Sequence, residues 1–92
     1  MFKTNEYFDG NVKSIAFQTE THPATVGVMA PGDYVFNTNE KETIVVVSGS
    51  LNIKTTNGEQ QTYHAGDSFE VAANSSFDVN VTSETAYLCL YG

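Results

Sequence analysis

Short runs of β-branched and aromatic residues recur along this chain, and turn-forming residues separate them. The runs are rich in Val, Ile, Thr, Phe and Tyr, which favour strands. Gly, Pro, Asn and Ser stand between them, and no window keeps the i, i+3, i+4, i+7 apolar spacing of an amphipathic helix. The pattern predicts about nine short strands. They cover residues 12–17, 24–30, 33–37, 43–47, 50–55, 60–63, 68–72, 77–82 and 85–91.

Many short strands with little or no helix between them indicate an antiparallel sandwich or barrel. Asn57-Gly58 is the strongest predicted hairpin turn, because a type I′ turn needs positive φ at both central residues. A chain of 92 residues has no room for a second hydrophobic core, so we expect one domain over residues 1–92.

The charge balance narrows the classes of partner. Four lysines and no arginine stand against eleven acidic residues, which gives a formal charge of −7. This charge excludes nucleic acid and anionic membranes as expected partners. No apolar leader and no run approaching about 20 apolar residues is visible, so we expect a cytoplasmic protein. Cys89 is the single cysteine and lies between Leu88 and Leu90, so we expect an ordinary strand thiol and no internal disulfide.

Alternation along the predicted strands assigns side chains to faces. Tyr34 and Phe36 share one face, and Phe77 begins the apolar face of a later strand. Lys13 has the same parity as Ile15, which places a lysine on the apolar side of the first predicted strand. In the alternative reading, the stem of this lysine packs while its ammonium group reaches water.

The segment 32–49 resembles the first sequence motif of the cupin family. That motif consists of a glycine, an H-x-H pair, a glutamate and a second glycine. Glu42 and Gly49 match its last two elements in residue type and spacing. The histidine pair does not match, because Thr38 and Glu40 stand at those positions, and the gap before Glu42 is two residues short.

The segment 66–77 is similar to the second cupin motif, with Phe77 at the position of its last histidine. The family's metal-binding histidines are therefore absent, and Glu42 alone would not hold a transition metal. His22 and His64 are isolated in sequence and are expected in loops. We therefore expect no metal site.

A fuller resemblance covers nearly the whole chain in order and at nearly constant spacing. The chain resembles the small cupin-fold pyrimidine/purine nucleoside phosphorylases of bacteria. The matching segments are residues 5–15, 26–29, 32–36, 48–52 and 87–89. The resemblance implies an all-β, single-domain, jelly-roll-like antiparallel barrel of the cupin type. It also implies a homodimeric pentosyltransferase that converts purine and pyrimidine nucleosides plus phosphate, reversibly, to ribose 1-phosphate and free base, with no cofactor.

Phosphorolysis of an N-glycosidic bond needs an anchored phosphate, stabilisation of positive charge on the ribose and help for the departing base. We assign Lys13 to phosphate and Glu42 to the ribose, as catalytic candidates. The alternative for Glu42 is a strand-end carboxylate paired with Lys41 or with a lysine elsewhere. Three tyrosines have the chemistry to protonate the base, and the sequence selects none of them: Tyr63, Tyr87 and Tyr91.

Aromatic residues on the predicted inward faces are candidates for binding the base. Tyr34, Phe36 and Phe77 would stack on either kind of base, since stacking reads a π face and not a hydrogen-bond pattern. Thr38 continues the face of Tyr34 and Phe36 and joins these substrate-binding candidates. The alternative is that the three rings are core. A second function also stays open, that of a metal-free cupin serving as a small-molecule binding or assembly module without catalysis.

Overall fold

The computed structural model describes residues 1–55 and 58–92, which form ten strands and no helix. The strands are β1 (Lys3–Tyr7), β2 (Val12–Gln18), β3 (Pro23–Met29), β4 (Gly32–Asn37), β5 (Glu42–Ser48), β6 (Ser50–Thr55), β7 (Gln60–His64), β8 (Ser68–Val71), β9 (Ser76–Val81) and β10 (Thr85–Tyr91). Within the described part of the chain there is accordingly no helix able to cross a membrane.

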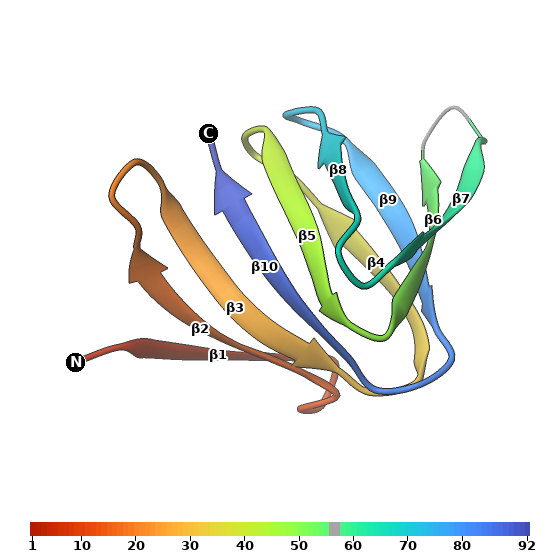
Figure 1. The fold of residues 1–92 in the computed structure, drawn as a ribbon, viewed down its shortest axis with the longest axis horizontal. Helices are drawn as coiled ribbons and strands as arrows, with labels where there is room; N and C mark the ends of the chain where they lie inside the picture. The colour runs from red at the N-terminus through yellow and green to blue at the C-terminus, as the bar shows by residue number, and fades with distance from the viewer. Residues whose placement is uncertain (56–57) are drawn as a thin grey trace.

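The strands form two antiparallel sheets. A six-stranded sheet has the order β1-β2-β3-β10-β5-β8, and a four-stranded sheet has the order β4-β9-β6-β7. Figure 1 shows the two sheets facing each other, with β1 and β2 extending beyond the region that the smaller sheet covers. The all-β, cupin-type prediction is confirmed, in the form of an open two-sheet sandwich and not a closed barrel.

The core lies between the sheets because alternate residues of each strand point inward. Phe77, Val79 and Val81 of β9 are buried, as their alternation predicts. Tyr34 of β4 is also buried, and Phe36 packs against the core from a half-buried position.

The first predicted strand turns the opposite face to the core from the one that we expected. Val12 and Ser14 of β2 are buried, whereas Ile15 is 47% exposed and Lys13 lies on its outward face. The expectation that Lys13 lies on the inward side is therefore wrong. The cause is that the outer face of the six-stranded sheet is itself apolar, so hydrophobicity alone does not identify the inner face of β2.

That outer face carries a row of four cross-strand partners, which we call the outer apolar row: Ile15, Val26, Leu88 and Val45. Ile15 pairs with Val26, Val26 with Leu88, and Leu88 with Val45. Ile15 and Val26 are each nearly half exposed. An apolar row of this kind across four strands is unusual on a solvent-facing sheet.

All nine predicted strands are present, and each bound agrees to within one residue. The sequence analysis did not predict β1. A tight turn joins β1 to β2, with positive φ at Phe8, Asp9 and Gly10 and a Gly10 N–H that donates to the Tyr7 carbonyl at 3.1 Å. In the predicted Asn57-Gly58 turn, Asn57 lies outside the described residues, while Gly58 has a φ of +87°.

Candidate functional site

A cavity of about 260 Å³ lies between the two sheets. Its lining residues are Tyr7, Ser14, Met29, Phe36, Asn37, Glu42, Ile44, Leu51, Phe77, Val79, Tyr87, Cys89 and Tyr91. We call it the inter-sheet pocket. Its floor is formed by core side chains, and Leu51 and Val79 are both 1% exposed.

The two walls of the pocket differ in chemistry. The six-stranded sheet supplies Glu42 from β5 and Tyr87, Cys89 and Tyr91 from β10, which share one face of that strand by alternation. The four-stranded sheet supplies mainly apolar side chains, among them the rings of Phe36 and Phe77, with Asn37 at the end of β4. A ligand in this pocket thus meets polar groups on one side and an aromatic surface on the other.

The aromatic wall is a stacked pair. The centroids of Phe36 and Phe77 lie 5.6 Å apart, with an angle of 26° between the ring planes. The two residues are cross-strand partners of β4 and β9, so sheet pairing sets their spacing. Phe36 also meets the ring of Phe8 edge-on, at 5.6 Å between centroids.

Glu42 is the carboxyl group on the polar wall. Its Oε1 accepts a hydrogen bond from the Cys89 thiol, with a sulfur–oxygen distance of 3.5 Å. Partial burial raises the pKa of Glu42 and nearby Glu40 adds to the rise, while the thiol hydrogen bond opposes it. Lys13 forms an ion pair with Glu6, whereas no ion pair joins Glu42 to Lys41 or to another lysine of the described residues.

The other polar groups of this wall are weak acids that stay protonated at neutral pH. Burial raises the pKa of Tyr87 to about 12 and that of the Cys89 thiol to about 12, and it also raises the pKa of Tyr91. The Tyr91 hydroxyl lies 3.0 Å from Thr25 Oγ1, in a hydrogen bond that either group can donate. The wall therefore presents neutral donors around one carboxyl group.

Gly27 of β3 makes room for the Tyr87 hydroxyl. A Cβ at Gly27 would lie 2.6 Å from Tyr87 Oη and 2.7 Å from the Lys13 carbonyl oxygen. Hydrogen bonding by Ser14, a buried residue of the pocket lining, opposes the rise that burial causes in the pKa of Tyr87. Three neighbouring strands thus fix the position of one phenol.

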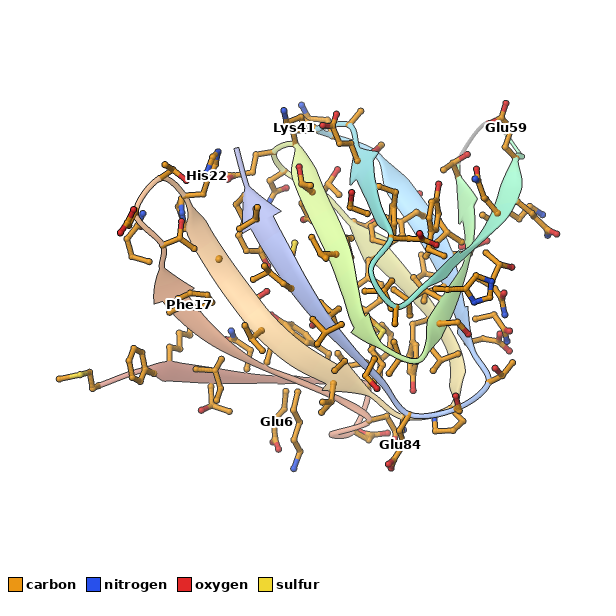
Figure 2. All side chains as sticks on the ribbon, viewed as in Figure 1. Glu6, Phe17, His22, Lys41, Glu59 and Glu84 are labelled. Atoms are coloured by element: carbon orange, nitrogen blue, oxygen red, sulfur yellow. The ribbon has the colours of Figure 1, made fainter. Side chains whose placement is uncertain are left out.

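Of the six predicted site residues, the pocket lining includes Glu42, Phe36 and Phe77. Lys13 is outside it, because its ammonium lies 3.1 Å from Glu6 Oε1 on the outer side of the six-stranded sheet. Figure 2 shows Glu6 pointing away from the sandwich.

Tyr34 and Thr38 are buried, but neither belongs to the pocket lining. The Tyr34 hydroxyl donates to the Ala30 carbonyl at 2.6 Å. The Thr38 hydroxyl donates to the Ala72 carbonyl at 2.7 Å and accepts from the Ser75 N–H at 3.0 Å. Both side chains thus hold loops in place.

The residues at the cupin metal positions do not fit a metal ion. The Thr38 hydroxyl is engaged in loop hydrogen bonds, and Phe77 is a ring of the aromatic wall. Glu42 alone faces the pocket, and no group of three His, Cys, Asp or Glu side chains converges anywhere in residues 1–55 and 58–92. His22 lies in a loop as predicted, whereas His64 is the exposed last residue of β7.

The sequence analysis missed several pocket residues, namely Tyr7, Ser14, Asn37 and Cys89. It named Tyr87 and Tyr91 without selecting them, and the pocket now includes both. Tyr63 instead stacks on Phe69, with 4.3 Å between the ring centroids. The alternation along β10 could have identified three of these residues, because it places Tyr87, Cys89 and Tyr91 on one face of the strand.

A larger and more open hollow of about 810 Å³ lies on the outer face of the four-stranded sheet. Its polar side chains bond to one another across the strands. Thr62 donates to Asn52 at 2.7 Å, Asn52 to Asn80 at 2.9 Å, and Asn80 to Asp33 at 2.7 Å. These groups are already satisfied and largely exposed, so the smaller inter-sheet pocket is the better candidate site.

Comparison with known proteins finds close similarity in sequence and in fold. Residues 2–91 match the family model described as pyrimidine/purine nucleoside phosphorylase. A protein of Alcanivorax borkumensis with that name is 60% identical, and the alignment covers 100% of this chain and 99% of the relative. One of Hahella chejuensis with the same name is 59% identical, with both chains covered in full, 100% each.

Solved structures give the same fold. A Vibrio parahaemolyticus protein of unknown function superposes with a TM-score of 0.96 at 44% identity, covering 100% of this chain and 99% of its own. A cupin superfamily protein from Desulfitobacterium hafniense superposes with a TM-score of 0.75 at 12% identity, covering 95% and 82%. The second likeness shows the cupin fold alone.

Proposed function

Because the chain belongs to the pyrimidine/purine nucleoside phosphorylase family, we propose that it transfers the pentosyl group of purine and pyrimidine nucleosides to phosphate, reversibly. A phosphate oxygen forms a bond to C1′ of the ribose as the bond from C1′ to the base nitrogen breaks. The electron pair of that bond stays on the nitrogen, which takes up the proton that phosphate gives up. The products are ribose 1-phosphate and the free base.

The observation that carries this proposal is the pocket with two unlike walls. A nucleoside has a planar base with two π faces and a ribose with several hydroxyl groups. The stacked pair Phe36 and Phe77 offers a surface to the base, and the wall that bears Glu42 and the β10 hydroxyls offers partners to the ribose. Recognition by stacking tolerates both classes of base, since each presents a π face.

We assign Glu42 to the ribose. As the glycosidic bond breaks, positive charge develops on the sugar, and a carboxyl group that can become negative beside it stabilises that charge. The half-buried position of Glu42 supports the assignment, because electrostatic interactions are stronger where water is largely excluded. Glu42 and the buried Cys89 thiol do not make a group of three potential metal ligands, and no such group occurs among the described residues, so we propose a reaction without metal or other cofactor.

We also propose that the protein is a homodimer formed through the outer apolar row. The four side chains of this row are uncharged, and the Glu6 carboxylate on the same face is paired with Lys13, so two copies of a chain with formal charge −7 would meet there with little repulsion between carboxylates. A two-fold axis places the same patch on both copies, as an isologous interface requires. The free edge of β1, the outermost strand of the larger sheet, is a second surface at which copies would pair.

The experiment that tests the function measures free base released from uridine and from adenosine by the EDTA-treated protein, with and without inorganic phosphate. We expect release from both nucleosides, dependent on phosphate, with ribose 1-phosphate as the second product. Release without phosphate would indicate a hydrolase instead. No release at high concentration of folded protein would favour the binding-module alternative.

A further inference from the structure

The inter-sheet pocket contains no cation. The chain has four basic residues, and all are lysines. Lys13 is paired with Glu6 on the outer face, Lys54 lines the hollow outside the four-stranded sheet, and Lys3 and Lys41 are exposed. Figure 2 shows Lys41 at the rim of the sandwich, outside the space between the sheets. A phosphate in the pocket would therefore have to be bound in another way than by the usual lysine or arginine.

Neutral hydrogen-bond donors are plentiful there. The lining includes three residues with a hydroxyl group, Ser14, Tyr87 and Tyr91, and one with a side-chain amide, Asn37. The burial that raises the pKa of both tyrosines keeps their hydroxyl protons in place. Such groups bind a tetrahedral oxyanion by hydrogen bonds without charge.

Glu42 is the obstacle to anion binding in this pocket. The titratable groups that face it are the Cys89 thiol and the phenols of Tyr91 and Tyr87 on β10, with Glu40 on the segment before β5. None of these groups carries positive charge. If ionised, Glu42 would repel phosphate in a partly buried site, where screening by water is weak.

We propose that this pocket binds phosphate through hydroxyl and amide donors alone, and that Glu42 takes up one proton from solvent as the anion enters. A protonated Glu42 then donates an O–H to a phosphate oxygen, in place of repelling it. It passes this proton to the phosphate as the phosphate gives its own proton to the departing base, so the carboxylate is negative when positive charge develops on the ribose. The inference rests on the proposed function for the identity of the anion. The burial that already raises the pKa of Glu42 in the free protein makes the uptake easier.

Sulfate is a suitable probe, because it resembles phosphate in shape and charge and does not titrate between pH 5 and pH 8. Its dissociation constant is measured by calorimetry across that pH range, in buffers of different ionisation enthalpy. For the unmodified protein we expect a net uptake of protons on binding. The affinity should weaken by up to about tenfold per pH unit above the pKa of Glu42.

Four variants separate the contributions. Glu42→Gln should bind sulfate with an affinity that does not change with pH, because the amide is always neutral. Glu40→Gln, a matched change at an exposed neighbouring carboxylate, should keep the pH dependence. Tyr91→Phe should weaken binding at every pH and keep the pH dependence, since it removes a neutral donor. Lys13→Ala should behave as the unmodified protein does.

Two results would overturn the inference. One is a Lys13→Ala variant that binds sulfate at least tenfold more weakly, since a lysine of the same or a second copy would then hold the anion. The other is a pH dependence that persists in Glu42→Gln. Failure of the proposed function has a different signature, because base release would then be absent while proton-linked sulfate binding remained.

Discussion

Glu42 combines two properties that usually exclude each other, a position among core side chains and an ionisable group. Its carboxyl group has the Cys89 thiol as hydrogen-bond donor and no ion-pair partner among the described residues. Burial raises its pKa above the ordinary value of 4.5, so the stability that this group contributes is fully present below that value and is lost as the pH rises through the raised pKa.

Replacement of Glu42 by Gln is therefore expected to separate activity from stability. We predict that kcat falls by roughly a hundredfold, because the amide cannot become negative beside the ribose. The melting temperature should rise slightly at pH 8, where the wild-type carboxylate is ionised, and should match the wild-type value at pH 4. Phosphorolysis rates and thermal unfolding at both pH values check this. An unchanged kcat would leave Glu42 without a catalytic role.

Thr38 illustrates a site candidate with a structural role. Thr38→Val removes a hydroxyl that binds Ala72 and Ser75, and it leaves their polar groups short of a partner. We predict a loss of about 1–3 kcal/mol of unfolding free energy with kcat/KM for uridine unchanged. Urea unfolding and steady-state kinetics test this, with Thr38→Ser as the variant that restores the hydrogen bonds. If Thr38→Val instead raised the KM for uridine at unchanged stability, Thr38 would be a substrate-binding residue.

At the level of strands, the alternation of β9 and β10 was readable from the sequence, whereas the identity of their neighbours was not. β10 pairs with β3 on one side and β5 on the other, and these contacts bring Glu42, Cys89 and Gly27 together from distant parts of the chain. Phe36 and Phe77 were predicted as pocket residues because the alternation of apolar and polar residues along their strands assigns each ring to the inward face. Lys13 was misplaced because both faces of β2 carry apolar residues, and β1 was missed because its residues are mostly polar.

The contact between β3 and β10 gives a prediction at this scale. Gly27→Ala places a methyl group against the Tyr87 hydroxyl and the Lys13 carbonyl, and the backbone atom cannot move aside alone. We expect a cost of about 1–3 kcal/mol in unfolding free energy and a lower kcat, because Tyr87 is displaced in the pocket. Val28→Ala, at the exposed next residue of β3, is the control and should change kcat little. Normal activity in Gly27→Ala would show that the position of Tyr87 is unimportant.

The whole molecule is acidic, and we propose its uncharged outer apolar row as the surface through which two copies pair. Like charges elsewhere repel two copies at low ionic strength, and salt screens that repulsion. We therefore predict a dimer whose dissociation constant falls as salt is raised. Val26→Asp should yield a folded monomer, because it places a carboxylate in the centre of the row. Light scattering after gel filtration measures the mass of the unmodified protein at each salt concentration and the mass of Val26→Asp. Val35→Asp, on the outer face of the other sheet, is the control and should stay dimeric. A Val26→Asp dimer would exclude this interface.

The floor of the inter-sheet pocket is also the hydrophobic core, and this shared use limits how the protein can acquire new substrates. Leu51 and Val79 pack the two sheets together and at the same time bound the space for the ligand. A substitution that enlarges the pocket there also creates a core cavity, at a cost of about 2–5 kcal/mol for Leu to Ala. Adaptation to bulkier nucleosides is thus expected to begin at the rim, at Tyr7 or Asn37, where side chains are exposed and changes leave folding intact.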